Sequence, residues 1–180
     1  MIEDLNKIAA YATPVRPGDV EAIEAQLGRR PRGLVGIGAR CACGTPAVTI
    51  TRPRLPEGAP FPTLFYLTLP SVVYEMSRLE AGGFMAEMNA RLAADPLLAE
   101  AHHAAHADYL ERRRRLGDVA EIEDVSVGGM PDRVKCLHAL AAYSMSVGKG
   151  LCPIGDLALE AAAWDRAICN CRDASERQAK

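Results

Sequence analysis

The sequence predicts a helix-rich α+β domain, in which a small antiparallel β-hairpin or sheet packs against about five helices. The first observation behind this prediction is that apolar residues recur every three or four positions in several long stretches, which is the spacing of one buried helix face. The second is that two neighbouring stretches, "GLVGIGAR" and "AVTITRPR", are strand-like, and the short turn "CACGTP" joins them as a hairpin.

Helix starts are marked by capping residues. Asp19 and Ser71 are suitable N-caps, and Asp95 followed by Pro96 is a pair typical of a helix start. Pro131 is expected to open a helix whose apolar residues step by three and four. The expected helices cover residues 19–27, 72–81, 84–94, 96–116 and 131–147, a last helix runs from 153 or 156 to 164, and a short strand covers 64–67.

Composition indicates one globular unit. The chain has 180 residues, of which 49% are apolar and 24% are charged, so it can bury a core without disulfide bonds. We expect residues 18–171 to form a single globular domain, residues 1–17 to form a flexible N-terminal arm, and residues 172–180 to form a polar tail.

Charge and hydropathy argue against two classes of partner. The formal net charge is −2, and the four arginines at 112–115 would spread around a helix, so we do not expect a nucleic-acid partner. No apolar run approaches the ~20 residues that span a bilayer, and Glu3 and Asp4 argue against a signal peptide. We therefore expect a cytoplasmic protein without a membrane partner, whose six cysteines are thiols or metal ligands.

Two C-x-C pairs are candidate metal ligands. Cys41 and Cys43 stand in the hairpin turn, and Cys169 and Cys171 repeat the spacing near the C-terminus. Two thiolates alone do not make a site, because zinc normally takes four ligands and an iron–sulfur cluster usually takes four cysteines. Several sets of four are possible once Cys136 is included, and free thiols in a turn, in the core and in the tail are the alternative.

The stretch "HHAAH" offers nitrogen ligands. His102 and His106 stand four residues apart, so on a helix they lie on one face and could share a metal. For His102 and His103 we favour a solvent-facing position, because imidazole is well solvated. His106 lies on a half-buried stripe with Tyr109.

The stretch "GGMPDRVKCLH" combines glycines, a predicted helix start and several charges. Free amides and the positive end of a helix dipole attract anions at such a start. Arg133 and Lys135 add positive charge there, and Arg54 stands in a proline-rigid segment that could contribute to the same site. The stretch therefore predicts an anion-binding site over 130–135, with solvated cations on a capped core helix as the alternative.

The same stretch contains three candidate catalytic residues, Asp132, Cys136 and His138. Near a helix start the thiolate of Cys136 would be stabilised by the dipole and by the nearby cations. On a regular helix, however, residues two apart point in different directions, so a Cys136–His138 catalytic pair has poor geometry.

Five stretches together resemble a known family: "RCACGTP", "PRLPEGAPFPTLFYLT", "SRLEAGGFM", "GGMPDRVKCLH" and "GLCPIGDLAL". They are similar to the bacterial, mainly actinobacterial, family called domain of unknown function 501, over roughly residues 18–160. Family genes tend to lie near those for a cell-division initiator and an exopolyphosphatase. The resemblance thus implies no established activity, and it points only loosely to division or phosphate metabolism.

The family pattern marks specific residues of this chain. It covers Arg40, Cys41, Cys43, Gly44, Pro46, Pro53, Arg54, Phe61, Pro62, Thr63, Arg78, Glu80, His106, Tyr109, Gly129, Pro131, Asp132, Arg133, Lys135, Cys136, His138, Pro153, Gly155 and Asp156. The chain departs from the pattern at Ala42, where proline is usual, at Leu69, where a polar residue or cysteine is common, and at Cys152, where asparagine is expected. These departures leave Cys41, Cys43 and Cys136 as the stronger ligand set.

Three functional hypotheses follow. The first is a cytoplasmic metal-binding domain for zinc or an iron–sulfur cluster; its ligands would be Cys41, Cys43 and Cys136, with His106, His138 or Cys171 as the fourth. The second is an enzyme for a small molecule bearing a phosphate or carboxylate, in which Asp132, His138 or Cys136 transfers a proton or attacks. The third is a non-catalytic adaptor that binds a protein partner in cell division.

Overall fold

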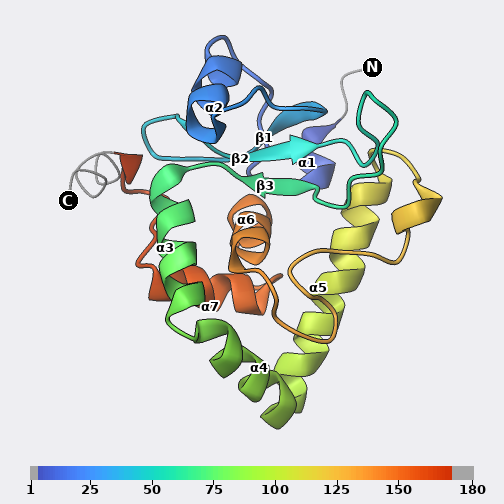
Figure 1. Ribbon diagram of the computed structural model, residues 1–180, viewed down its shortest axis with the longest axis vertical. Helices are drawn as coiled ribbons and strands as arrows, with labels where there is room; N and C mark the ends of the chain where they lie inside the picture. The colour runs from blue at the N-terminus through green and yellow to red at the C-terminus, as the bar shows by residue number, and fades with distance from the viewer. Residues whose placement is uncertain (1–3, 172–180) are drawn as a thin grey trace.

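The computed structural model describes residues 4–171 (Figure 1). Its elements in chain order are α1 (Leu5–Ile8), α2 (Asp19–Leu27), β1 (Leu34–Arg40), β2 (Pro46–Thr51), β3 (Phe65–Leu67), α3 (Pro70–Ala81), α4 (Phe84–Ala94), α5 (Pro96–Arg114), the 3-10 turn η1 (Ala120–Ile122), α6 (Leu137–Val147) and α7 (Pro153–Ala161). The helix-rich α+β class with a small antiparallel sheet is confirmed, and the described residues contain seven α-helices where about five were expected.

β2 is the middle strand of the sheet. It pairs antiparallel with β1, where Leu34 lies opposite Thr51, and antiparallel with β3, where Phe65 lies opposite Ile50. Every residue of β2 is buried, because α2 lies over one face of the sheet and α6 over the other (Figure 1). The predicted hairpin is confirmed, and its turn carries the sequence "CACGT" at 41–45.

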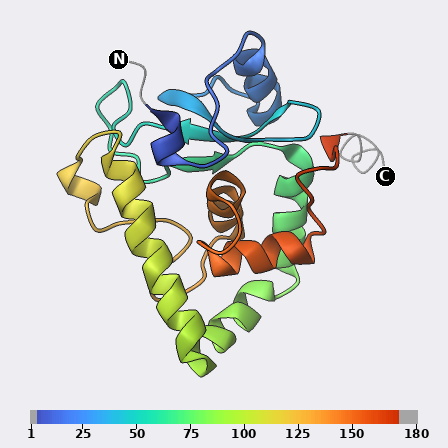
Figure 2. The same ribbon diagram turned by 180° about the vertical axis from the view of Figure 1, so that it is seen from behind.

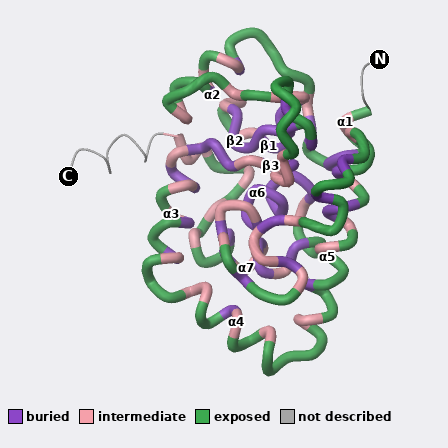
Figure 3. The backbone as a smooth tube through the Cα atoms, turned by 45° about the vertical axis from the view of Figure 1, so that its right-hand side comes forward, coloured by how far each residue is buried: buried purple, intermediate pink, exposed green. Residues whose placement is uncertain are grey.

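α6 is the central helix of the molecule. Residues 140–147 are all buried (Figure 3), and α3, α5 and α7 surround them on the side away from the sheet (Figure 2). A Cβ atom at Gly155 of α7 would lie 2.3 Å from the Leu140 carbonyl oxygen, so only glycine allows α7 to approach this closely. In the core, Phe65 stacks on Tyr143 with ring centroids 5.8 Å apart, and Tyr109 meets both rings edge-on.

Residues 4–17, predicted to be part of a flexible arm, lie against the body of the molecule. Ile8 and Ala9 are buried in the core. The backbone of Thr13 exchanges two hydrogen bonds with Ile37 of β1, at 2.8 and 2.9 Å. Arg112 of α5 donates from its Nη1 to the Ile8 carbonyl at 2.7 Å. The hydrophobic core therefore includes residues that precede position 18.

The three predicted helix caps have different outcomes. Asp19 is the first residue of α2 and not its cap, because Gly18 is the N-cap residue. Asp95 caps α5 as predicted, because its Oδ1 accepts hydrogen bonds from the amides of Leu97 and Leu98 at 3.0 and 3.2 Å. α3 begins at Pro70 and not after Ser71, since proline is well suited to the first position of a helix.

The helix predicted to begin at Pro131 begins at Leu137. Asn89 of α4 holds the backbone of Val134 by both polar groups: its Oδ1 accepts from the Val134 amide and its Nδ2 donates to the Val134 carbonyl, each at 2.9 Å. Glu80 of α3 then accepts the Leu137 amide at 2.7 Å, so a carboxylate of the protein already occupies the start of α6. Residues 131–136 form a loop, and the prediction of a helix start over 130–135 is wrong.

Among the described residues, no helix has both the length and the apolar character needed to cross a membrane.

Candidate functional site

Arg40 fixes the hairpin turn. Its two terminal nitrogens donate to the two carboxylate oxygens of Asp19 at 2.8 and 2.7 Å, and its Nε donates to Thr13 Oγ1 at 2.9 Å. Nη1 also donates to the Gly44 carbonyl within the turn at 3.0 Å. The side chains of Arg40 and Asp19 are only 10% and 7% exposed, and the guanidinium holds the pKa of Asp19 below its ordinary value despite burial. The backbone that carries the two turn cysteines is therefore firmly placed.

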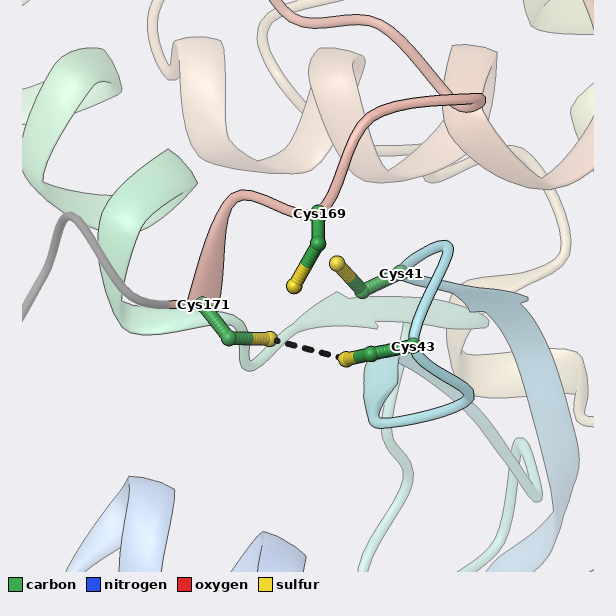
Figure 4. Close-up of side chains that lie close together, drawn as sticks. All are labelled: Cys41, Cys43, Cys169 and Cys171. Carbon is green, nitrogen blue, oxygen red and sulfur yellow. Dashed lines mark hydrogen bonds between the residues drawn. The ribbon is translucent and has the colours of Figure 1, made fainter.

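Four cysteines converge on this turn (Figure 4). The sulfur atoms of Cys41, Cys43, Cys169 and Cys171 all lie within 4.8 Å of one another. Cys43 Sγ and Cys171 Sγ are 3.4 Å apart, and the amide of Asn170 donates to Cys41 Sγ at 3.3 Å. The second pair belongs to the segment after α7, which returns to the hairpin. Cys169 is absent from the predicted ligand set, although the repeated C-x-C spacing is its signal in the sequence.

The pKa values of Cys43, Cys169 and Cys171 are shifted in different directions. The hydroxyl and the amide of Thr45 lower the pKa of Cys43 to about 6. Burial, and then the neighbouring Cys43 sulfur, raise the pKa of Cys171. The Cys171 amide lowers the pKa of Cys169, but the Cys43 sulfur and burial outweigh it and the net shift is upward. Of these three thiols, Cys43 therefore ionises most readily, and a metal that binds Cys169 and Cys171 must displace their protons.

The other predicted ligands lie outside this cluster. Cys136 belongs to a second group of side chains, and His106 is engaged through Nδ1 with Ser126 Oγ at 2.9 Å. Cys152 is a fully buried core thiol whose pKa burial raises to about 12. His102 is fully buried, so the prediction that it faces solvent is wrong.

The second group joins Glu80 of α3 to Cys136 and His138 at the start of α6. One possible ligand atom from each of the three residues lies within 4.8 Å of the others. His138 Nδ1 lies 3.1 Å from Glu80 Oε1, while Nε2 lies 3.2 Å from the Val73 carbonyl and 3.1 Å from Ser77 Oγ. Cys136 is the N-cap residue of α6, with backbone angles of −149° and 112°, so helical spacing does not separate it from His138. The objection from helical spacing therefore does not apply here, and the Cys136 sulfur lies within 4.8 Å of a His138 ring nitrogen.

The two side chains of this pair shift each other's protonation. Cys136 raises the pKa of His138 to about 9 against the effect of burial, and Glu80 adds to the shift. Burial alone would raise the pKa of Cys136, but the His138 ring and the Ala139 amide hold it below its ordinary value. These shifts favour a thiolate at Cys136 and an imidazolium at His138. Glu80 has a signal in the sequence only through the family pattern.

An open cavity of about 680 Å³ adjoins this pair. Leu27 of α2, Phe65 and Leu67 of β3 and Val73 of α3 contribute apolar wall, and Cys136 and His138 line one side of it. Its volume falls in the range of ordinary small-molecule sites.

The predicted anion-binding residues are not gathered at one point. Arg54 is ion-paired with Glu121: its Nη2 donates to Oε1 at 2.9 Å and to Oε2 at 2.7 Å. Arg133 and Lys135 are exposed in the loop that precedes α6. The Asp132 side chain is 83% exposed and lies 3.8 Å from a histidine of α5.

The fold and the sites define a helix-rich α+β protein with a four-cysteine cluster and a separate thiol–imidazole pair. The chain belongs to the family described as protein of unknown function (DUF501), whose model matches residues 37–160. That span includes Cys41, Cys43 and the second group, whereas Cys169 and Cys171 lie beyond it. No curated protein and no solved structure matches the chain.

Proposed function

We propose that the protein binds one zinc ion through Cys41, Cys43, Cys169 and Cys171. The observation that carries this proposal is the mutual distance of the four sulfurs, all within 4.8 Å. Tetrahedral zinc with Zn–S bonds near ~2.3 Å spaces its sulfurs about 3.8 Å apart, so the side chains need only small adjustments. The Cys43 thiolate provides a first ligand without proton loss near neutral pH.

Zinc is favoured over an iron–sulfur cluster by the same distances. An iron–sulfur cluster inserts several irons and sulfides between the cysteines, so its four thiolates stand farther apart than those around a single ion. The four sulfurs here are spaced for a single metal ion. A histidine ligand is not part of the proposed site, because His106 and His138 are engaged elsewhere.

The proposed zinc has a structural role. Four cysteine ligands complete a tetrahedral site and leave no position for a substrate. The two C-x-C pairs are 128 residues apart in the chain, measured between Cys43 and Cys171. A metal bound by both pairs fastens the segment after α7 to the hairpin turn. Thiolate ligands persist in a reducing compartment, so the proposal places the protein in the cytoplasm.

Elemental analysis of protein purified without oxygen tests the proposal. We expect about one zinc per chain in the wild type, and a loss of most of it in Cys43→Ser and Cys171→Ser. Cys136→Ser is the matched control, because it removes a thiol outside the cluster and should retain the zinc. Wild-type protein that holds no zinc, and whose four cysteines stay equally open to alkylation after zinc is added, would contradict the proposal.

The fluorescence of Trp164 tests whether the zinc has a structural role. Trp164 is the only tryptophan of the chain and lies between α7 and the second cysteine pair. Removing zinc with a chelator should change its fluorescence in the wild type and in Cys136→Ser, and should change nothing in Cys171→Ser. Unchanged emission in all three proteins would show that the metal does not fasten this segment.

A further inference from the structure

The Glu80–Cys136–His138 group is arranged as an ion pair and not as a metal site. Glu80 Oε1 accepts a hydrogen bond from the Leu137 amide. Because this carboxylate oxygen acts as an acceptor, His138 Nδ1 is the donor in its hydrogen bond to Glu80. Ser77 Oγ uses its only hydrogen to donate to the Val73 carbonyl at 3.0 Å. Both oxygens near His138 Nε2 can therefore only accept a hydrogen bond from it. Both ring nitrogens therefore donate, and the ring offers no lone pair to a metal.

A doubly protonated His138 suits a thiolate partner. The imidazolium lies within 4.8 Å of the Cys136 sulfur and stabilises negative charge on it. To protonate a leaving group, the ring gives up one of its two present hydrogen bonds, and the proton of that nitrogen is transferred. Glu80 holds the ring in place from α3, in the way that a third group orients the base in other nucleophilic sites. Cys136 is half-buried on the cavity wall, so a bound molecule can reach its sulfur.

Two buried polar groups on the cavity wall have no hydrogen-bond partner among the described residues. Thr68 is 1% exposed and lines the cavity, yet its Oγ1 has no hydrogen-bond partner among the described residues. The Oε1 of Gln26, on another part of the cavity wall, is also buried without a partner. Native proteins rarely leave buried polar groups unpaired, and a ligand with a polar group and an apolar body would satisfy both the hydroxyl and the walls.

We propose that Cys136 is the nucleophile of an acyl-transfer site, which accepts an apolar acyl group from an ester or thioester bound in this cavity. The Cys136 sulfur supplies the electron pair that forms a bond to the carbonyl carbon. The bond from that carbon to the alcohol or thiol breaks, and its electron pair leaves with the departing oxygen or sulfur. The departing atom takes the proton of His138, so the products are S-acyl-Cys136, a neutral imidazole and the free alcohol or thiol.

Glu80 is a positioning residue in this scheme, since it acts through His138. The inference is independent of the zinc proposal, because the two groups share no residue. The cysteine cluster can lose its metal without removing the nucleophile, and Cys136 can be replaced without removing a proposed zinc ligand.

Acylation by p-nitrophenyl octanoate tests the proposal directly. We expect a burst of p-nitrophenolate close to one equivalent, and a peptide containing Cys136 that carries the octanoyl group by mass spectrometry. At pH 6.5 the acylation rate should exceed that of glutathione by about tenfold or more, because a larger fraction of the protein thiol is ionised. Cys136→Ala should lose the burst, while Cys43→Ser should keep it.

Two comparisons test the role of the cavity: esters with acyl groups of different length, and a substitution at Thr68. The octanoyl ester should acylate Cys136 several-fold faster than the acetyl ester, because the apolar walls bind the longer chain. Thr68→Val should slow octanoylation several-fold with no loss of thermal stability, because it removes an unpaired hydroxyl and keeps the side-chain shape. Glu80→Gln should lower the acylation rate and move its pH profile toward that of an ordinary thiol, which a merely structural role would not do.

Three results would overturn the proposal. They are acylation of the folded wild type at Cys136 no faster than that of glutathione, acetyl and octanoyl esters reacting equally fast, and acyl groups only on Cys43 or the second cysteine pair. Each of these results is measured on the wild-type protein, so misfolding of a variant cannot produce it. None bears on zinc content, so failure here is distinguishable from failure of the zinc proposal.

Discussion

Replacing Asp19 by asparagine should reveal how strongly the hairpin turn is anchored. Asp19 receives two charged hydrogen bonds from Arg40, and both side chains are almost wholly buried. The substitution keeps the size of the side chain but leaves a buried guanidinium without its counter-charge. Breaking a buried ion pair on one side costs about 3–5 kcal/mol. Thr13 and the Gly44 carbonyl still accept from Arg40, so we expect a value near the lower end, about 3 kcal/mol.

The assay is urea unfolding of metal-free protein at pH 7, followed by circular dichroism. Thermal unfolding of the same two proteins should show a midpoint lowered by roughly 6–12 °C, as expected for a loss of about 3 kcal/mol in a chain of this size. Glu24→Gln on the exposed side of α2 is the matched control and should change stability by less than about 0.5 kcal/mol.

The pH dependence gives a second check with a definite sign. The folded-state pKa of Asp19 lies below its ordinary value of 3.8, so its contribution is present above pH 4 and is lost as the pH falls through the folded-state pKa. The stability difference between wild type and Asp19→Asn should therefore shrink below pH 4. A difference under about 1 kcal/mol at pH 7, or one that does not change with pH, would refute the anchoring role of this pair.

Other consequences of the structure are open to single measurements. Asn89→Ala should cost about 2 kcal/mol in urea unfolding, because it removes two hydrogen bonds to the backbone of Val134 and leaves those groups unpaired; a cost near zero would mean that the loop before α6 does not need this contact. In the wild type, His138 should titrate by NMR with a pKa of about 9, so it is charged at neutral pH and loses its proton only as the pH rises through that value. Glu80→Gln should lower this pKa, and an unshifted titration would exclude the carboxylate as a cause. Gly155→Ala should prevent stable packing of α7, since its Cβ would lie 2.3 Å from a carbonyl oxygen of α6; a fully folded variant would show that the two helices can separate at little cost.

Local signals in the sequence were sufficient for most helix boundaries. Asp95 followed by Pro96 predicts the start of α5, and the structure shows that cap. Gly28 stands where α2 ends, in the left-handed conformation that favours glycine. These features depend on residues within one or two turns of the boundary, so the sequence contains the whole cause.

The start of α6 could not be predicted in this way. Pro131 is locally a good first residue for a helix, but Asn89 and Glu80, which lie more than 40 residues earlier, bind the backbone of Val134 and Leu137. Their hydrogen bonds outweigh local propensity, because each satisfies a backbone group that a helix beginning at Pro131 would use differently. Once the helix begins at Leu137, Cys136 has extended backbone geometry, and its sulfur lies within 4.8 Å of a His138 ring nitrogen.

The sequence by itself determined the chemical inventory: the helix-rich class, the hairpin, two C-x-C pairs, and a cysteine and a histidine two residues apart. Only the tertiary structure decided how these residues combine. The return of the chain after α7 joins Cys169 and Cys171 to the hairpin turn, and it leaves Cys136 to a different group beside the cavity. The physical reason is that ligand sets and catalytic pairs require atoms within a few ångströms of one another, and packing contacts between distant segments set those distances.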